Sequence, residues 1–339
     1  MTQPKDFKVT SVPPNLRVEP LPLDDTPVRF DHILARAKVM KRVLNRLLAA
    51  AQTNVAVLIL GETGTGKDLA AESIHLRSRH REGPFVALNV GAIPRDLVAS
   101  ELFGHEAGSF TGAQTRRQGK LARAQGGTLF LDEINSMDLQ AQAALLRVLE
   151  NGSYFPVGSD QSRTADVRII AASNADLQAL AAKGLFRLDL YWRLETFILH
   201  LPPLRERPGA VPLLAQQFLR EFNAAHGLSV KGIDEQAAAL LESYPWPGNV
   251  RELKNVIQSA LLIARTGMLG PQHLPERILQ SKPDGDSFKV PDDLSLKALT
   301  AAYSRHVLAA CGGNKSKAAD RLGITRKSLY AILKRSHDK

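Results

Sequence analysis

The sequence of 339 residues contains a single cysteine, Cys311. One cysteine cannot form an intrachain disulfide, which favours a reducing, cytoplasmic location. Long apolar runs are missing too: the longest useful one, VAVLIL at residues 55–60, is far too short to span a bilayer. The first ten residues, MTQPKDFKVT, lack the apolar segment of a secretory signal peptide. We therefore expect a protein without a membrane partner and without a secretory route.

Internal repeats and low-complexity tracts are also missing, and a composition of 44% hydrophobic and 23% charged residues fits a globular protein of two or three domains. The net charge of +10 is unevenly spread. Residues 297–339 hold ten Lys or Arg and two Asp or Glu, so this end carries +8 of the total. A short, strongly basic end suggests contact with a polyanion. The alternative, a solvated basic tail, is disfavoured by the helical pattern described below.

Apolar and helical segments alternate through the middle of the chain. We predict strands at residues 55–60, 85–90, 128–131, 167–171 and 197–201, with helices at 67–77 and 139–151 among them. Strands that alternate with helices predict a mostly parallel α/β sheet. After Pro202 the strand signal fades, and residues 212–263 are predicted to form a small all-helical unit, with WPGN at 246–249 as a break before one helix.

The predicted organisation has five parts. An irregular arm with five prolines before Thr26 covers residues 1–28, and an α/β unit follows at 29–205. The helical unit spans 206–280, and a linker rich in Pro, Gly and Asp spans 281–295. Residues 296–339 are predicted to form an all-α domain of three helices.

A glycine-rich stretch, GETGTGK at residues 61–67, directly follows a predicted strand and opens a predicted helix. Glycines let backbone N–H groups turn inward around phosphates, and the helix N-terminus adds a favourable dipole. The stretch therefore predicts a phosphate-binding loop whose lysine reaches the β- and γ-phosphates; an ordinary strand-to-helix turn is the less favoured alternative. The general pattern continues with Ser or Thr, but here an aspartate follows. The predicted nucleotide contacts are Gly61, Glu62, Thr63, Gly64, Thr65, Gly66, Lys67 and Asp68.

Carboxylates end a second predicted strand, in which Asp132 and Glu133 follow apolar residues 128–131. Asp132 is placed to hold Mg²⁺ through water, and Glu133 to orient and deprotonate an attacking water. Acidic pairs at strand ends also arise by chance, so this pair gains weight from its position downstream of a phosphate loop. Asn174 ends the next predicted strand and could hold the attacking water or sense the γ-phosphate; a turn-forming asparagine is the alternative.

Six segments appear in a fixed order: GETGTGKD, ELFGHEAGSFTGA, GTLFLDEI, FRLDLYWRL, LPPLRER and WPGNVREL. Together they resemble the central domain of bacterial enhancer-binding proteins, the AAA+ ATPases that activate sigma-54 RNA polymerase. The resemblance covers residues from about 30 to 274. It implies an α/β AAA+ P-loop domain with a parallel sheet and a helical lid, with ATP and Mg²⁺ as ligands. Asp68 stands where members commonly carry Glu.

The family contacts sigma-54 through a loop that usually reads GAFTGA, and here residues 108–113 read GSFTGA. The resemblance implies that the lone aromatic is exposed as an anchor for another protein, while the glycines let the loop move with nucleotide state. The alternative is that the aromatic packs into its own domain. The predicted sigma-54 contacts are Gly108, Ser109, Phe110, Thr111, Gly112 and Ala113.

Further roles follow from the same resemblance. Asn89 matches an asparagine that restrains the catalytic Glu133 until nucleotide is sensed. Arg187 and Arg193 match arginines offered to the ATP of a neighbouring subunit, and Arg251 matches the lid arginine that reads the bound nucleotide. An arginine supplied in trans can raise the rate by ~10³–10⁵, so hydrolysis would require a ring, in the family a hexamer. For each arginine a surface ion pair is the alternative.

The basic end contains NKSKAADRLGITRKSLYAILKR. Ala319, Gly323 and Leu329 fall at the spacing of a helix-turn-helix, in which Ala packs, Gly turns and Leu faces the core, and Thr325 can cap the second helix. The pattern resembles the Fis-type domain that ends most proteins of this family, in which the helix at about 296–310 would pair two subunits. The predicted DNA contacts are Asn314, Lys315, Lys317, Thr325, Arg326, Lys327, Ser328 and Tyr330.

The sequence therefore predicts an ATP-hydrolysing transcription activator. Dimers would bind upstream double-stranded DNA, assemble into a hexameric ring and remodel the closed complex of sigma-54 RNA polymerase. Only about 28 residues precede the ATPase, whereas most members begin with a regulatory domain, so we expect control by a regulatory protein acting in trans or by expression level.

The main alternative is a DNA-binding regulator that keeps the AAA+ fold without engaging sigma-54, which the near-intact GSFTGA loop disfavours. A second alternative is an AAA+ unfoldase or helicase loader. It is disfavoured because the GSFTGA loop has a single aromatic residue, whereas a pore loop has an aromatic pair. A purely structural DNA-binding protein would not need Asp132, Glu133 or the two trans arginines.

Overall fold

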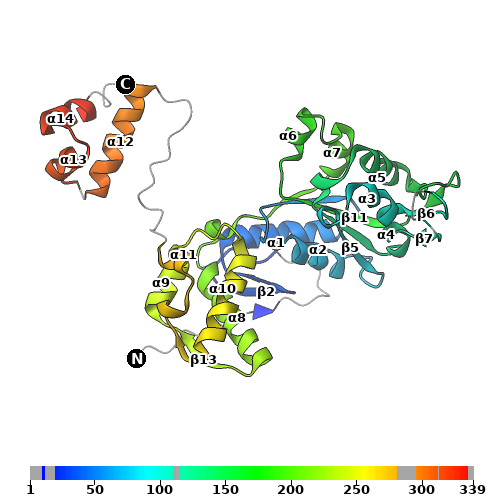
Figure 1. The fold of residues 1–339 in the computed structure, drawn as a ribbon, viewed down its shortest axis with the longest axis horizontal. Coiled ribbons are helices and arrows are strands. Elements are labelled where there is room, and N and C mark those ends of the chain that lie inside the picture. Colours follow the sequence, from blue (N-terminus) through cyan, green and yellow to red (C-terminus); the bar gives the residue numbers. More distant parts are fainter. Residues whose placement is uncertain are drawn as a thin grey trace. The chain divides into compact units, whose positions relative to one another are not determined.

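The structure, a computed structural model, describes residues 10–11, 20–109, 113, 115–280, 295–311 and 313–334 (Figure 1). The chain divides into two compact units, Met1–Leu279 and Gln280–Lys339. Within the described residues, no helix combines the length and the apolar character that crossing a membrane requires.

A five-stranded parallel sheet forms the centre of the first unit, in the order β12-β4-β11-β8-β5. Its strands are β4 (Val57–Leu60), β5 (Phe85–Asn89), β8 (Thr128–Asp132), β11 (Arg168–Ser173) and β12 (Ile198–His200). All five strands were predicted, each to within a residue or two, and the predicted parallel sheet is confirmed.

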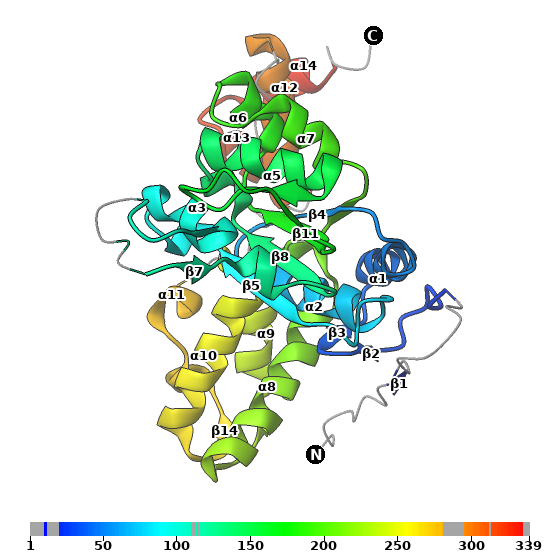
Figure 2. The ribbon, with the colours of Figure 1, turned by 90° about the vertical axis from the view of Figure 1, so that its right-hand side faces the viewer.

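Helices cover both faces of this sheet (Figure 2). Side chains of β4 alternate between the two cores, since Val57 and Ile59 lie in one and Leu58 in the other. Both faces of the sheet at β4 are therefore shielded from water, which explains why this strand is a continuous apolar run. The helices are α1 (Lys38–Ala51) and α2 (Lys67–Leu76) on the first face, and α3 (Arg95–Phe103), α4 (Lys120–Arg123), α5 (Leu139–Asn151), α6 (Leu177–Ala182) and α7 (Leu188–Leu194) on the second.

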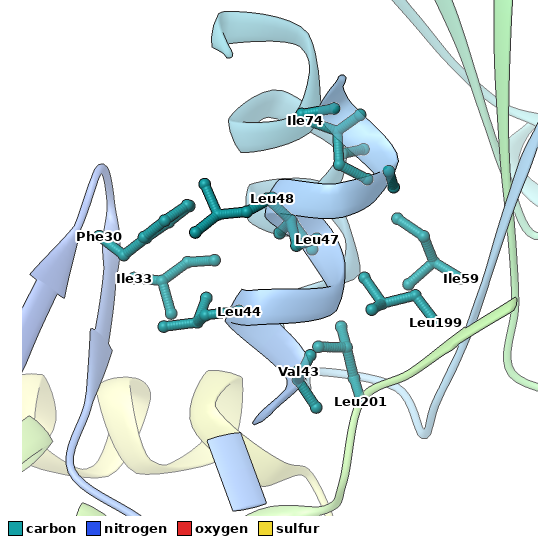
Figure 3. Close-up of a cluster of buried hydrophobic side chains, with 14 of the residues drawn as sticks. Phe30, Ile33, Val43, Leu44, Leu47, Leu48, Ile59, Ile74, Leu199 and Leu201 are labelled. Atoms are coloured by element: carbon teal, nitrogen blue, oxygen red, sulfur yellow. The ribbon is translucent and has the colours of Figure 1, made fainter. Parts of the chain in front are cut away.

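A small hairpin, not predicted, precedes the sheet. Its strands β2 (Val28–Phe30) and β3 (Ile33–Ala35) are antiparallel, and Phe30 and Ile33 pack against Leu44 and Leu48 of α1 (Figure 3). The arm expected to be irregular is partly ordered, because β1 (Thr10–Ser11) pairs in parallel with β2. Close by, the backbone of Leu21 exchanges two hydrogen bonds with the Asn45 side chain of α1.

The last part of the first unit is the lid, which packs around the fully buried Trp246. Its helices are α8 (Ala210–His226), α9 (Glu235–Ser243), α10 (Asn249–Ala264) and α11 (Glu276–Leu279). The predicted helical lid is confirmed, but it is not all-helical as expected, because β13 (Ser229–Ile233) and β14 (Thr266–Leu269) form a parallel pair. Both strands are short and contain a glycine, and only Val230 and Leu269 are buried in them, so no alternating pattern was long enough to recognise.

The remaining elements of the first unit are short. They are β6 (Gly104–His105), β7 (Arg117–Gln118), β9 (Ser153–Tyr154) and β10 (Arg163–Thr164), with 3-10 turns η1 (Val90–Ala92), η2 (Ile134–Ser136), η3 (Leu204–Glu206) and η4 (Pro271–His273). The second unit contains α12 (Leu296–Ala310), α13 (Lys315–Arg321) and α14 (Arg326–Lys334), which confirms the three helices predicted there.

Candidate functional site

The predicted nucleotide-handling residues meet at the carboxyl edge of the central sheet. The strand register pairs Asn89 with Asp132 and Ser173 with Leu60, and because Ala171 pairs with Leu131 the two pairs are offset by one residue. This edge is where open α/β sheets bind ligands. A cleft of about 740 Å³ opens here, and it is lined by residues 63–68, Asn89, Asp132, Glu133 and Arg251, together with Arg29, His32, Ile33 and Leu34 of the hairpin and Leu214 and Phe218 of α8.

The phosphate loop has the conformation that glycine allows. Gly64 and Gly66 have φ values of 79° and 95°, in the left-handed region that favours glycine. The Lys67 ammonium donates hydrogen bonds to the carbonyl oxygens of Gly61 (2.9 Å) and Glu62 (3.2 Å). Burial lowers the pKa of Lys67, while nearby Asp132 and Glu133 act in the opposite direction. A cation at the N-terminus of α2 suits this loop to an anionic ligand.

The two carboxylates stand beside this loop. Asp132 accepts a hydrogen bond from the N–H of Glu133 (2.9 Å), and Glu133 itself is held at φ 54°, a conformation that costs energy outside glycine. A Cβ on Gly91 would overlap the Glu133 carboxylate, so the absence of a side chain at that position leaves room for the carboxylate where it stands. Oxygen donors of this kind suit Mg²⁺, which prefers one or two carboxylates with water and phosphate over an all-protein cage. The residues therefore fit the expected ion.

Asn89 lies among these groups but does not bond Glu133. Its amide nitrogen is 3.5 Å from Asp132 Oδ2, and its Oδ1 accepts from the N–H of Ala92 (3.0 Å). The expected restraint on Glu133 is thus not formed in this structure. Asn174 donates to Thr63 Oγ1 (3.1 Å), which anchors it to the phosphate loop.

The lid closes one side of the cleft through the first turn of α10. The N–H groups of Val250 and Arg251 donate to the carbonyl of Gly64 at 3.0 and 3.3 Å, so the lid touches the phosphate loop directly. Arg207, not singled out from the sequence, donates to the Thr65 carbonyl (2.9 Å), and burial lowers its pKa to about 10.

Arg205 and Asn249 were also missed, and both bind the Glu62 carboxylate. The Glu62 side chain therefore turns to the lid, whereas the sequence analysis counted it among the nucleotide contacts. LPPLRER and WPGN were noticed only as a family motif and a helix break.

The two candidate trans arginines lie outside the cleft. Arg187 precedes α7 and pairs with Asp189 (2.7 Å), which is the ion pair left open as an alternative. Arg193 donates to the carbonyl of Leu149 at 2.8 and 3.1 Å. Both side chains are exposed, so the structure does not bring them to the chain's own phosphate loop.

The GSFTGA loop is described only at its base, and Phe110, Thr111 and Gly112 lie outside the described residues. The N–H of Gly108 donates to the carbonyl of Ala113 (2.7 Å), which holds the two ends together. Ser109 lies against Gly158 in the turn between β9 and β10: a Cβ on Gly158 would be 2.5 Å from that of Ser109. Within the described residues the buried Ser109 hydroxyl has no hydrogen-bond partner.

The second unit has the predicted helix-turn-helix geometry. Ala319 and Leu329 are buried, and Gly323 turns with φ 67°. Thr325 caps α14 by accepting from the N–H of Ser328 (3.1 Å). Thr325, Arg326, Lys327, Ser328 and Tyr330 are all exposed at the start of α14, as a DNA-reading surface requires.

Two other predicted DNA contacts have partners within the domain. Asn314 caps α13, since its side-chain oxygen accepts from the N–H groups of Ser316 (3.1 Å) and Lys317 (3.2 Å). Lys315 donates to the Tyr330 hydroxyl (3.1 Å), and its ammonium lies 4.4 Å from the centre of that ring. Lys317 is exposed.

Family models match three consecutive segments of the chain. Residues 33–200 match the sigma-54 interaction domain, residues 205–289 the AAA+ ATPase lid domain, and residues 305–335 the bacterial regulatory protein, Fis family. The three matches follow the α/β unit, the lid and the helix-turn-helix in order.

Of two similar proteins, one has a name that agrees with these family matches and one has a name that does not. The DNA-binding transcriptional regulator NtrC of Azospirillum brasilense is 40% identical over 329 residues, covering 88% of this chain and 68% of the relative. A protein of Geobacillus stearothermophilus described as limonene hydroxylase is 44% identical over 317 residues, covering 92% of this chain and 57% of the relative. The chain thus spans roughly three fifths of the length of these relatives.

Among solved structures, NtrX from Brucella abortus in complex with ADP superimposes with a TM-score of 0.70 at 29% identity, covering 90% of this chain and 69% of that one. The same protein in complex with ATP gives a TM-score of 0.67, also at 29% identity.

Proposed function

Because the chain belongs to the family of bacterial sigma-54-dependent transcriptional activators, we propose that it hydrolyses ATP to convert the closed promoter complex of sigma-54 RNA polymerase into the open one. The observation that carries this proposal is the cleft at the carboxyl edge of the sheet, where a phosphate loop, two carboxylates and a lid arginine converge. The NtrX structures, solved with ADP and ATP, support nucleotide binding at such a fold.

In this proposal the loop amides and Lys67 hold the phosphates, and the hairpin and α8 enclose the rest of the nucleotide. Asp132 would hold Mg²⁺ through water, and the ion would neutralise charge that develops on the phosphates. Glu133 orients and deprotonates the attacking water. Asn174 and Arg251 contact the nucleotide from the neighbouring strand end and the lid.

Assembly supplies the remaining groups. Arg187 and Arg193 are exposed and lie away from their own cleft, which is where arginines offered to a neighbouring subunit must stand. Arginines supplied in trans imply a ring, and we propose the hexamer that is typical of the family, assembled from dimers paired through α12. DNA is bound by the exposed start of α14, and the 281–295 segment links this domain to the ATPase.

The GSFTGA loop would engage sigma-54, with Phe110 as its anchor. A Phe110→Ala variant tests this role because it separates coupling from chemistry. We expect ATP hydrolysis near the wild-type rate and no opening of a sigma-54 promoter. Leu262→Ala, which removes an exposed apolar side chain from the lid, is the matched control and should behave as wild type in both assays.

Two outcomes would redirect the proposal. A parallel loss of hydrolysis in Phe110→Ala would give the loop a structural role. If the unmutated protein hydrolyses ATP but opens no promoter, the result would favour the alternative of a DNA-binding AAA+ regulator that does not engage sigma-54.

A further inference from the structure

The Glu62 carboxylate is held from two directions by the lid. Arg205, in η3 at the entry to the lid, donates to both oxygens of Glu62, at 2.9 and 2.6 Å. Asn249, the first residue of α10, donates to Oε2 at 3.0 Å. A residue of the phosphate loop is thus bound by two lid segments that lie far apart in the sequence.

Asn249 joins these segments through one buried amide. Its side chain is fully buried, and its backbone has φ 53°, a conformation that asparagine tolerates better than most residues. Its Nδ2 also donates to the Thr63 carbonyl (3.0 Å), and its Oδ1 accepts from the N–H of Leu204 (2.7 Å). The nitrogen end of the amide therefore holds the phosphate loop, while its oxygen end ties α10 to η3.

This joint fixes the place of Arg251, two residues further along α10. The N–H of Arg251 donates to the Gly64 carbonyl, and a Cβ placed on Gly64 would be 3.1 Å from that of Arg251. Loop and helix are in direct contact at this point, so a shift of α10 moves Arg251 relative to the phosphate site.

We propose that Asn249, Glu62 and Arg205 form a clasp that positions Arg251 over the phosphate loop, and that its loss impairs nucleotide binding and hydrolysis through Arg251. The hydrolysis part rests on the proposed function, whereas the positioning part does not. The Glu62–Arg205 pair alone is weak evidence, because its side chains are 42% and 46% exposed and exposed ion pairs contribute little. The proposal rests mainly on the buried Asn249 amide. Water cannot replace the hydrogen bonds of a buried polar group, so losing them is costly.

Amide hydrogen exchange on the full-length protein tests whether the clasp holds the lid. Asn249→Asp keeps the size of the side chain and the acceptor for Leu204, but removes both donors and sets a carboxylate beside Glu62. We expect the amides of Val250 and Arg251 to exchange about 10- to 100-fold faster, the range for losing hydrogen bonds to a charged group. Glu62→Ala should act in the same direction.

Glu82→Ala serves as the control, because Glu82 is also paired with an arginine but is 87% exposed. Unchanged protection at residues 250 and 251 in both clasp variants would overturn the clasp. A uniform loss of protection over the whole lid would instead show a general stabilising role and would also contradict it.

A double-mutant cycle tests whether the clasp acts through Arg251. Affinity for ATP without magnesium is measured for wild type, Asn249→Asp, Arg251→Ala and the double variant, with Glu62→Ala in place of Asn249→Asp as a second cycle. We expect the double variant to be no weaker than Arg251→Ala alone, because a mispositioned arginine and a missing one are equivalent. Effects that multiply would refute positioning.

Because this experiment measures ATP binding, it tests the clasp even if the wild type does not hydrolyse ATP. A lack of hydrolysis would reject the proposed function but not the clasp. Where hydrolysis is measurable, the clasp variants should lower kcat as well as raise KM, and Arg205→Lys should recover part of the loss caused by Arg205→Ala.

Discussion

Replacing Gly64 by alanine probes the contact between the phosphate loop and the lid. Gly64 has φ 79°, and a Cβ there would lie under 3.0 Å from the carbonyl oxygen of Gly248, at the start of α10. The obstacle is backbone, so it cannot swing aside as a flexible side chain would. Either the loop changes its conformation or the lid moves away.

The cost has two parts. An L-residue in the left-handed region costs about 1–2 kcal/mol, and overpacking of a filled site costs about 1–3 kcal/mol. Gly64→Ala should therefore lower the free energy of unfolding by about 2–5 kcal/mol, unless the lid yields. If the lid yields by about 1 Å, the misplacement lowers the hydrolysis rate by about 10²-fold.

Gly227→Ala separates these two parts. Gly227 ends α8 with φ 62°, and nothing lies within 4 Å of the position its Cβ would take. This variant meets only the conformational cost, so it should lose about 1–2 kcal/mol with nucleotide affinity unchanged. Urea unfolding and fluorescence titration with ADP measure both quantities.

The reasoning fails if Gly64→Ala and Gly227→Ala are equally stable and bind ADP equally well. That result would mean that the lid does not rest on the phosphate loop in solution.

Other changes have equally definite outcomes. Glu133→Gln should bind ATP but show no steady-state hydrolysis, and measurable turnover would remove its role as the base. Lys327→Ala should weaken DNA binding, and the salt slope should fall by about one unit if Lys327 contacts phosphate; unchanged affinity removes it from the interface. The free energy of unfolding should decrease as the pH falls below 6.5, because burial lowers the pKa of His75 and the unfolded chain then binds more protons; a slope in His75→Gln equal to that of wild type would contradict this. Asp24→Asn should destabilise the protein more than Lys41→Met in urea unfolding, because it leaves the fully buried Lys41 ammonium without its carboxylate; the reverse order would contradict this.

Much of the fold could be predicted from the sequence because the patterns that indicate it are local. The strands of the central sheet are covered on both faces, so their middle residues are mostly apolar, as in β4 (VLIL) and β8 (TLFLD). The phosphate loop requires glycines where φ is positive, as at Gly64 and Gly66, and the helix-turn-helix requires a small residue, a turn and a core leucine at fixed spacing. These structural requirements involve only a few neighbouring residues, so each produces a recognisable sequence pattern.

The rest depends on contacts between distant segments. Asn249 and Glu62 are 187 residues apart in sequence, and Arg205 and Glu62 are 143 apart. No local sequence pattern indicates that the side chain of a loop glutamate will point to the lid, so Glu62 was predicted to contact the nucleotide. The β13 and β14 strands were missed for a related reason, since each is recognisable only beside its partner.

Open-complex formation at a sigma-54 promoter tests the central claim most directly. Purified protein at high concentration is combined with sigma-54 RNA polymerase and a supercoiled template, with ATP or a non-hydrolysable analogue. The account predicts promoter opening with ATP, none with the analogue, and none with Glu133→Gln. Opening that proceeds equally well with the analogue, or no opening by a protein that hydrolyses ATP, would contradict it.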